Sequence, residues 1–140
     1  MRLDKLTTTF QQALAEAQSL AVARDNPYIE PAHLLAAMLE QPDGPKALLA
    51  RAGANTAGLK TAADTMIHGL PSVQGGGQVQ VGRDLAQLLQ AAEKDAGKRG
   101  DQFIASEMFL LALADAKNDI GGIVRGHGLT RKALEAAIDA

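Results

Sequence analysis

The chain has 140 residues, a formal net charge of −2 and no cysteine. This length supports one hydrophobic core, and the lack of cysteine excludes a disulfide scaffold and thiol catalysis. The interspersed charges form no clustered basic face, so no nucleic-acid partner is indicated. Aromatic residues make up only 3%. Good helix formers dominate and β-branched residues are sparse, which predicts an all-α protein.

Four helices are predicted in the first half of the chain. Thr8 and Gln11 are spaced as a capping box near the start of the first helix. Pro31 suits the first position of the second helix, and Gly53 suits the left-handed residue that ends the third. The expected ranges are 7–24, 31–39, 46–52 and 56–68.

The second half repeats this order. Residues 10–65 align without a gap on residues 85–140, and matched positions share apolar character or a helix-ending glycine. The corresponding helices are expected over 84–98, 106–116, 120–126 and 130–140. The duplication predicts a pseudo-two-fold domain of two four-helix repeats, about eight helices in all, with a groove at the junction of the halves.

The whole chain, 1–140, is interpreted as one domain. Repeat one covers 1–70, a Gly-rich connection covers 71–83, and repeat two covers 84–140. Three successive glycines make the connection flexible; its alternating valines permit a short extended stretch, but no sheet is predicted. The last helix stops short of its counterpart, so we expect a fragment of a longer protein.

The chain carries no recognisable catalytic motif. It has no P-loop for ATP, no nucleophile elbow and no histidine pair with metal-ligand spacing. His33 lies in an apolar stretch and is interpreted as a packed residue, and His127 is interpreted as a helix-end residue. We therefore expect no enzyme activity, and no catalytic, cofactor-binding or metal-binding residue. The N-terminus lacks a signal-peptide core and no run reaches membrane-span length, so a cytoplasmic protein without a membrane partner is expected.

Apolar residues in the second half exceed the needs of one helix face. In the predicted helices 84–98 and 106–116 they spread around much of the circumference, notably at Leu88, Leu89 and Met108. A helix this apolar is either buried on two sides or partly open as a binding groove. Both alternatives stay open at this point.

Several stretches resemble the N-terminal domain of the ClpB family of Hsp100 (Clp) AAA+ disaggregases. The resemblance covers the whole chain, and its first 21 residues and the Arg-Gly-Asp-x-Phe-Ile segment distinguish this family from others that carry the same duplicated domain. The matching segments are 1–7, 10–11, 13–15, 17–21, 29–31, 33–35, 70–71 and 98–104, and the tract ending at 106–107 fits as well.

This resemblance implies a substrate-recruitment domain. It would bind unfolded or aggregated polypeptides and pass them to the pore of an AAA+ hexamer that works with the DnaK system. ATP and magnesium would bind in AAA+ modules of the parent protein, and this domain would bind no cofactor. The isolated domain would be a monomer. The implied substrate-binding residues are Thr7, Asp101, Glu107, Leu88, Leu89 and Met108.

Two alternatives remain. The same fold in protease-linked Clp unfoldases docks adaptor proteins on a polar surface. A purely structural cap that regulates pore access is the second possibility. Dependence on an apolar groove favours client capture, sensitivity to charge reversal favours adaptor docking, and no binding to any unfolded chain favours the cap.

Overall fold

The computed structural model describes residues 3–75 and 77–140. Met1, Arg2 and Gly76, the last within the predicted connection, lie outside the described residues. The described residues form a short 3₁₀ helix, η1 (Leu3–Lys5), eight α-helices and two short strands. None of these helices is both long and apolar enough to cross a membrane. The helices are α1 (Thr8–Ala23), α2 (Pro31–Leu39), α3 (Pro45–Arg51), α4 (Thr56–His68), α5 (Arg83–Lys98), α6 (Ser106–Ala114), α7 (Asp119–Gly126) and α8 (Arg131–Ile138).

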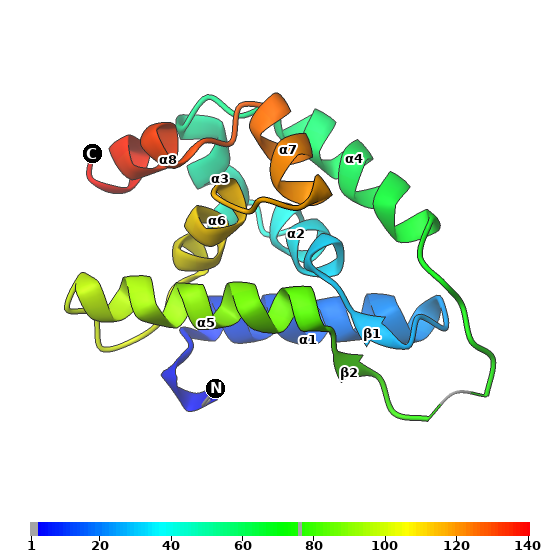
Figure 1. The fold of residues 1–140 in the computed structure, drawn as a ribbon. Coiled ribbons are helices and arrows are strands. Elements are labelled where there is room, and N and C mark those ends of the chain that lie inside the picture. Colours follow the sequence, from blue (N-terminus) through cyan, green and yellow to red (C-terminus); the bar gives the residue numbers. More distant parts are fainter. Residues whose placement is uncertain (1–2, 76) are drawn as a thin grey trace.

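The duplication is visible in the positions of these helices, which confirms the predicted all-α, pseudo-two-fold fold. In Figure 1 the long helices α1 and α5 run along the bottom of the molecule, and the shorter helices lie above them. α1 packs on α2 as α5 packs on α6. The first residues of three pairs of equivalent helices lie 75 positions apart: Thr8 and Arg83, Pro31 and Ser106, and Thr56 and Arg131.

The core is built around α2 and α6. All nine residues of α2 and all but Glu107 of α6 are buried. Phe10 of α1 and Phe109 of α6 meet here, with ring centroids 6.4 Å apart and planes tilted by 55°, an arrangement that aromatic pairs favour. Of the two alternatives for the strongly apolar second-half helices, burial on all sides therefore applies to α6.

Glycines end the third helix of each half. Gly53 and Gly128 have φ of 84° and 88°, the left-handed region that only glycine adopts readily, as predicted for Gly53. The two turns meet, because the Asn55 N–H donates to the His127 carbonyl at 2.8 Å. A Cβ on Gly128 would lie 3.2 Å from the Gly53 carbonyl oxygen. Gly128 therefore lets the halves approach closely, whereas a Cβ on Gly53 would meet nothing within 4 Å and that residue is required only for its positive φ.

The predicted capping box at the start of α1 is wrong. Thr7 is the N-cap, and its Oγ1 accepts a hydrogen bond from the Phe10 N–H at 3.3 Å. The Gln11 side chain instead donates to the Leu6 carbonyl at 2.9 Å. The N-cap therefore lies one residue before the predicted Thr8, directly after Leu6, which pairs with Ile104.

A small parallel sheet also forms where none was predicted. β1 (Tyr28–Ile29) pairs with β2 (Gln80–Val81), with Ile29 opposite Val81. Two-residue strands carry almost no local signal. They form because α1, α2 and α5 bring the two segments together.

A buried polar chain ties α2 to the start of the connection. The Glu30 N–H donates to His33 Nδ1 at 2.9 Å, so Nε2 carries the proton and donates to Asn26 Oδ1, also at 2.9 Å. Asn26 in turn donates to the Pro71 carbonyl at 3.0 Å. Burial, with a smaller contribution from the charge of Arg24, lowers the pKa of His33 below 6.5. His33 is thus the packed residue that was predicted, and it is neutral.

We predict that this histidine makes the fold less stable in mild acid. The unfolded chain takes up a proton near pH 6.5, whereas the folded chain takes it up only at lower pH, so the free energy of unfolding falls as pH drops below 6.5. Burial raises the pKa of Glu30 above 4.5, which acts in the opposite direction because the folded chain then holds the proton more tightly. Urea unfolding across this range should therefore show a steeper fall for the wild type than for His33→Gln, which keeps Glu30. If the free energies of unfolding of the wild type and of His33→Gln fall equally with pH, His33 is not neutral in the folded chain.

A second prediction concerns the aromatic pair. Phe109→Ala should lower the free energy of unfolding by about 3–5 kcal/mol, because it opens a cavity in the core. The matched control is Phe103→Ala, since Phe103 is 53% exposed and its loss should change stability by only about 0.5 kcal/mol. If urea unfolding shows equal losses of unfolding free energy for the two variants, Phe109 is not a core residue.

Candidate functional site

The candidate site lies where the start of one repeat pairs with the middle of the other. Leu6 and Ile104 form a parallel bridge. The Ile104 N–H donates to the Lys5 carbonyl at 2.7 Å, and the Thr7 N–H donates to the Ile104 carbonyl at 3.0 Å. This bridge holds the start of α1 against the start of α6, and residues on either side of it line two hollows.

The first hollow brings two predicted site residues together. Thr7, the N-cap of α1, and Glu107, in the first turn of α6, both line a space of about 350 Å³. Both residues are half-buried. The turn before α3 contributes Asp43, and α3 contributes Arg51. The wall therefore contains one cation and, with Glu107, two carboxylates. The other lining residues are Thr9, Asp43, Gly44, Pro45, Leu48, Arg51, Ala105, Ser106 and Ile138.

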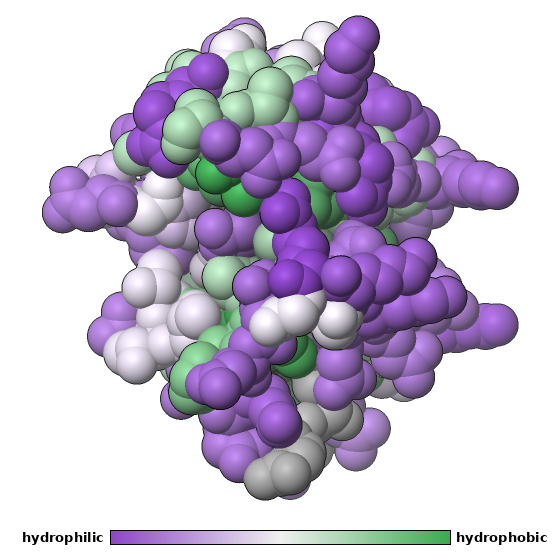
Figure 2. Space-filling view, turned by 90° about the vertical axis from the view of Figure 1, so that its left-hand side faces the viewer, coloured by the Kyte–Doolittle hydropathy of each residue, from purple (hydrophilic) through white to green (hydrophobic). Residues whose placement is uncertain are grey.

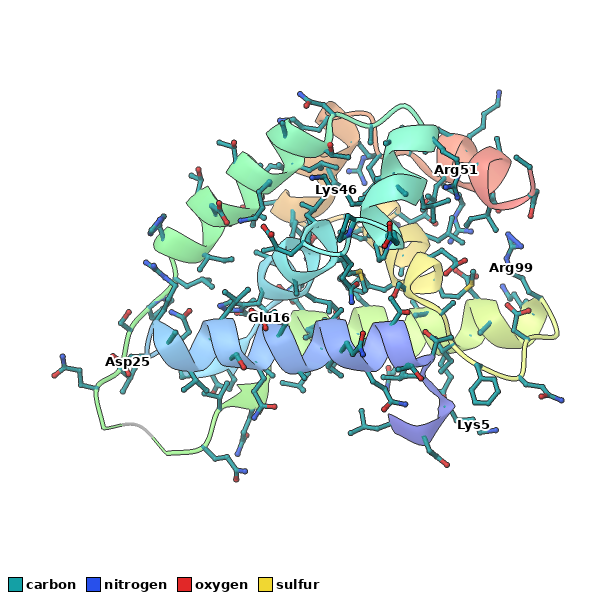
Figure 3. All side chains as sticks on the ribbon, turned by 180° about the vertical axis from the view of Figure 1, so that it is seen from behind. Lys5, Glu16, Asp25, Lys46, Arg51 and Arg99 are labelled. Carbon is teal, nitrogen blue, oxygen red and sulfur yellow. The ribbon has the colours of Figure 1, made fainter. Side chains whose placement is uncertain are left out.

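The second hollow contains the third predicted polar residue. Asp101 is exposed in the turn between α5 and α6, where its N–H donates to the Ala96 carbonyl at 3.0 Å. It lines a shallow space with Asp4, Lys5, Gln102 and Phe103. Figure 3 shows Lys5 beside the start of α1 and Arg51 at the other end of this region, on α3.

Each hollow has two carboxylates and one cation. Asp43, Glu107 and Arg51 line the first, and Asp4, Asp101 and Lys5 line the second. Both spaces therefore have a small excess of negative charge. Such a surface favours neutral or basic segments of a bound chain over acidic ones.

A buried hydroxyl at the first hollow has no partner. Ser106 is 5% exposed, and its Oγ makes no hydrogen bond within the described part of the chain. Buried polar atoms are nearly always paired in folded proteins. Because this Oγ is itself buried, a group bound in the hollow would reach it only after a small movement of the wall.

The three apolar site residues lie elsewhere. Met108 is 2% exposed, and Leu88 and Leu89 are 8% and 7% exposed. All three belong to the core cluster and none lines either hollow. To contact a bound chain, they would first have to become exposed. On the side of the molecule shown in Figure 2, hydrophobic surface appears only in small areas between hydrophilic residues.

The arrangement suits binding more than chemistry. Within residues 3–75 and 77–140, no group of three or more histidines or carboxylates is placed to hold a metal ion. Apart from the buried Ser106, the polar residues of the two hollows are half-buried or exposed, and they offer hydrogen bonds and charge along an open surface. An extended polypeptide that crosses the Leu6–Ile104 bridge could use both hollows.

Sequence reasoning missed the contribution of α3. Asp43 and Arg51 lie far along the chain from Thr7 and Glu107, and neither belongs to a motif. The only local signal was the Pro-Asp-Gly turn at residues 42–44, which predicts a chain reversal but not what the turn will face. Tertiary contacts bring these charges to the hollow: the Gln41 side chain donates to the Thr9 carbonyl at 3.0 Å, and α3 packs against α8, α2 and α4.

Comparison with known proteins gives this chain a family. The model of the Clp repeat (R) N-terminal domain matches residues 5–127. The chaperone protein ClpB of Pseudomonas putida is 45% identical over 99% of this chain, and that of Vibrio cholerae is 41% identical over the same share. The alignments cover 16% of each relative, so the chain spans about a sixth of their length.

Solved structures share the fold at lower identity. The Hsp104 N-terminal domain from Candida albicans has a TM-score of 0.81 and 22% identity, covering 95% of this chain and 88% of that one. The N-domain of ClpV from Vibrio cholerae has a TM-score of 0.80 and 24% identity, covering 96% and 83%. A ClpV N-domain in complex with a VipB peptide has a TM-score of 0.77 and 21% identity, covering 96% and 85%. With the family model covering most of its length, the chain belongs to the Clp repeat N-terminal domain family and is similar to the N-terminal region of ClpB chaperones.

Proposed function

We propose that this domain recruits unfolded or aggregated polypeptide segments, in the cytoplasm, for a ClpB-type disaggregase. The observation that carries the proposal is that Thr7 and Glu107, 100 residues apart in sequence, line one hollow. Asp101 lines the neighbouring hollow across the Leu6–Ile104 bridge. A client segment would lie across both. ATP, magnesium and the DnaK system would act on other parts of the full-length protein.

The chemistry of the hollows suits a weak and unselective contact. A flexible client loses conformational entropy on binding, and half-exposed charges return little of it. The affinity of one domain should therefore be on the order of micromolar or weaker. Several copies on one hexamer would compensate by raising the effective concentration.

A second candidate function is docking of one particular partner peptide. It is favoured by the ClpV N-domain relative, whose structure contains a VipB peptide. The two functions differ in selectivity. A client site should accept many unrelated unfolded segments, whereas an adaptor site should accept one sequence and reject a scrambled version of it.

The carboxylates provide the first test. Glu107→Gln and Asp101→Asn should each weaken binding of a permanently unfolded polypeptide by roughly threefold to tenfold, because each removes a charge-assisted hydrogen-bond acceptor. The control is Glu93→Gln, which neutralises an exposed carboxylate of α5 that lines neither hollow. Fluorescence anisotropy measures the affinity. Thr7→Ala is less informative, since loss of the N-cap alone costs about 1 kcal/mol.

Asp101→Asn and Glu93→Gln change exposed side chains and should unfold within about 0.5 kcal/mol of the wild type. Glu107→Gln changes a half-buried carboxylate in the first turn of α6 and should cost no more than about 1 kcal/mol. If Glu107→Gln and Asp101→Asn bind the unfolded chain as tightly as Glu93→Gln, the hollows are not the client site. Amide shifts in an NMR titration with the same polypeptide would then locate the contact, if one exists.

The buried apolar residues provide the second test. Met108→Glu should lower the free energy of unfolding by several kcal/mol, because it places an unpaired charge in the core. Met108→Leu, which nearly conserves volume, should cost less than about 1.5 kcal/mol. A stable Met108→Glu domain that has lost client binding would show instead that Leu88, Leu89 and Met108 open into a groove.

A further inference from the structure

The pseudo-two-fold symmetry relates the two strand pairings of this domain. Leu6 and Val81 lie 75 residues apart, as do Ile29 and Ile104. Leu6 pairs with Ile104, and Val81 pairs with Ile29, both in parallel. The domain therefore has two equivalent places where a third strand could be added, one outside Leu6 and one outside Val81.

The edge at Leu6 is closed. In the bridge, both backbone groups of Ile104 are used by the neighbouring segment, so Leu6 points its own N–H and carbonyl away from it. The Leu6 N–H donates to the Leu3 carbonyl at 3.1 Å, within the turn formed by η1. The Leu6 carbonyl accepts from the Gln11 side chain at 2.9 Å. Leu6 itself is 2% exposed.

The equivalent edge at Val81 is open. Pairing with β1 uses Gln80, whose N–H donates to the Pro27 carbonyl at 3.3 Å, and Gly82, whose N–H donates to the Ile29 carbonyl at 3.0 Å. Val81 thus points outward. No partner for its N–H or carbonyl exists among the described residues. The position equivalent to Gln11 is Ala86, which has no side-chain donor. Figure 1 shows β2 at the lower margin of the fold, outside β1.

Exposed aliphatic and aromatic side chains lie among the polar residues around this edge. Val81 is 44% exposed, Tyr28 50% and Val73 49%. A hollow of about 260 Å³ adjoins the start of β2 and is lined partly by Val22, Val73 and Val79. Natural sheets usually protect exposed edges with very short strands, charges, bulges or covering segments, and of these devices β2 shows the short strand. An open edge next to exposed aliphatic side chains is a template for strand addition.

We propose that the β2 edge is a second contact site, at which an extended segment with aliphatic side chains at alternate positions adds as a third strand beside Val81. Recognition here reads the backbone of the bound segment and therefore tolerates many sequences. A second copy of this chain is a poorer occupant, because an edge of two residues cannot bury the roughly 1,200 Å² that a stable interface needs. The site is distinct from the two hollows beside Leu6 and Ile104.

The test uses a short synthetic peptide in which Val and Thr alternate. Titrated into the isotopically labelled chain, it should shift the amide resonances of Val79 and Val81. Val81→Pro removes the outward N–H while the bonds to β1, made by Gln80 and Gly82, remain. It should weaken peptide binding about tenfold, the effect of one backbone hydrogen bond. Val81→Thr keeps the N–H and the branched side chain and should bind within about twofold of the wild type. Equal affinity for both variants would overturn the proposal.

A second measurement leaves the protein unchanged, in case Val81→Pro does not fold. Two peptides are N-methylated on alternate residues, one on all Val and one on all Thr. Because successive residues of a strand point their N–H groups to opposite edges, only one of the two should lose about tenfold in affinity. Equal affinities would refute strand addition.

Sedimentation of the free chain tests the other occupant. A dimer that Val81→Pro abolishes would assign the edge to a second copy and overturn binding of a client strand. Failure of the strand site can also be told apart from failure of the proposed function at the hollows. If Glu107→Gln weakens client binding while Val81→Pro leaves the alternating peptide bound, only the strand site fails.

Discussion

Two short helices that are apolar on nearly every side, α2 and α6, constrain the rest of this structure. A helix without a polar face cannot lie on a surface, so other elements must cover it all round. α1 and α4 cover α2, while α5, α7 and α8 cover α6. Phe10 and Phe109 join α1 to α6, and hence the first half to the second, inside the same core.

When the other elements cover these helices, segments of opposite repeats come together and pair as strands. The segment before each long helix of one repeat lies beside the segment before the central helix of the other repeat. This brings Leu6 to Ile104 and Val81 to Ile29. The candidate site and the open edge are therefore products of the duplication, since neither repeat contains either feature by itself.

Departures from symmetry distinguish the two ends of the domain. At one end η1 and Gln11 satisfy the outward backbone groups of Leu6, and carboxylates and cations gather in the adjacent hollows. At the other end the outward backbone groups of Val81 have no partner among the described residues, and the side chains of Val73, Val81 and Tyr28 are exposed. The first end is suited to polar and charged contacts, the second to backbone pairing. Two modes of recognition on one small domain would let it hold chains of varied sequence, each contact being weak.

The helices, the duplication and several helix ends could be predicted from sequence because these features depend on nearby residues. Helix propensity, the apolar repeat and the left-handed glycine at Gly53 act within a few positions of the chain. The resemblance of the sequence to a family also indicated Thr7, Asp101 and Glu107, although it could not indicate their geometry. Their roles in binding remain proposals.

Only the tertiary structure decided which of these residues meet. Thr7 and Glu107 share a hollow because Leu6 bonds to Ile104 across the domain, a pairing that no local pattern encodes. The burial of Met108 and the two-residue sheet likewise depend on contacts between distant parts of the chain. An apolar side chain in a helix looks alike in sequence whether it faces the core or a groove. The choice is made by the elements packed around it, which come from distant parts of the chain.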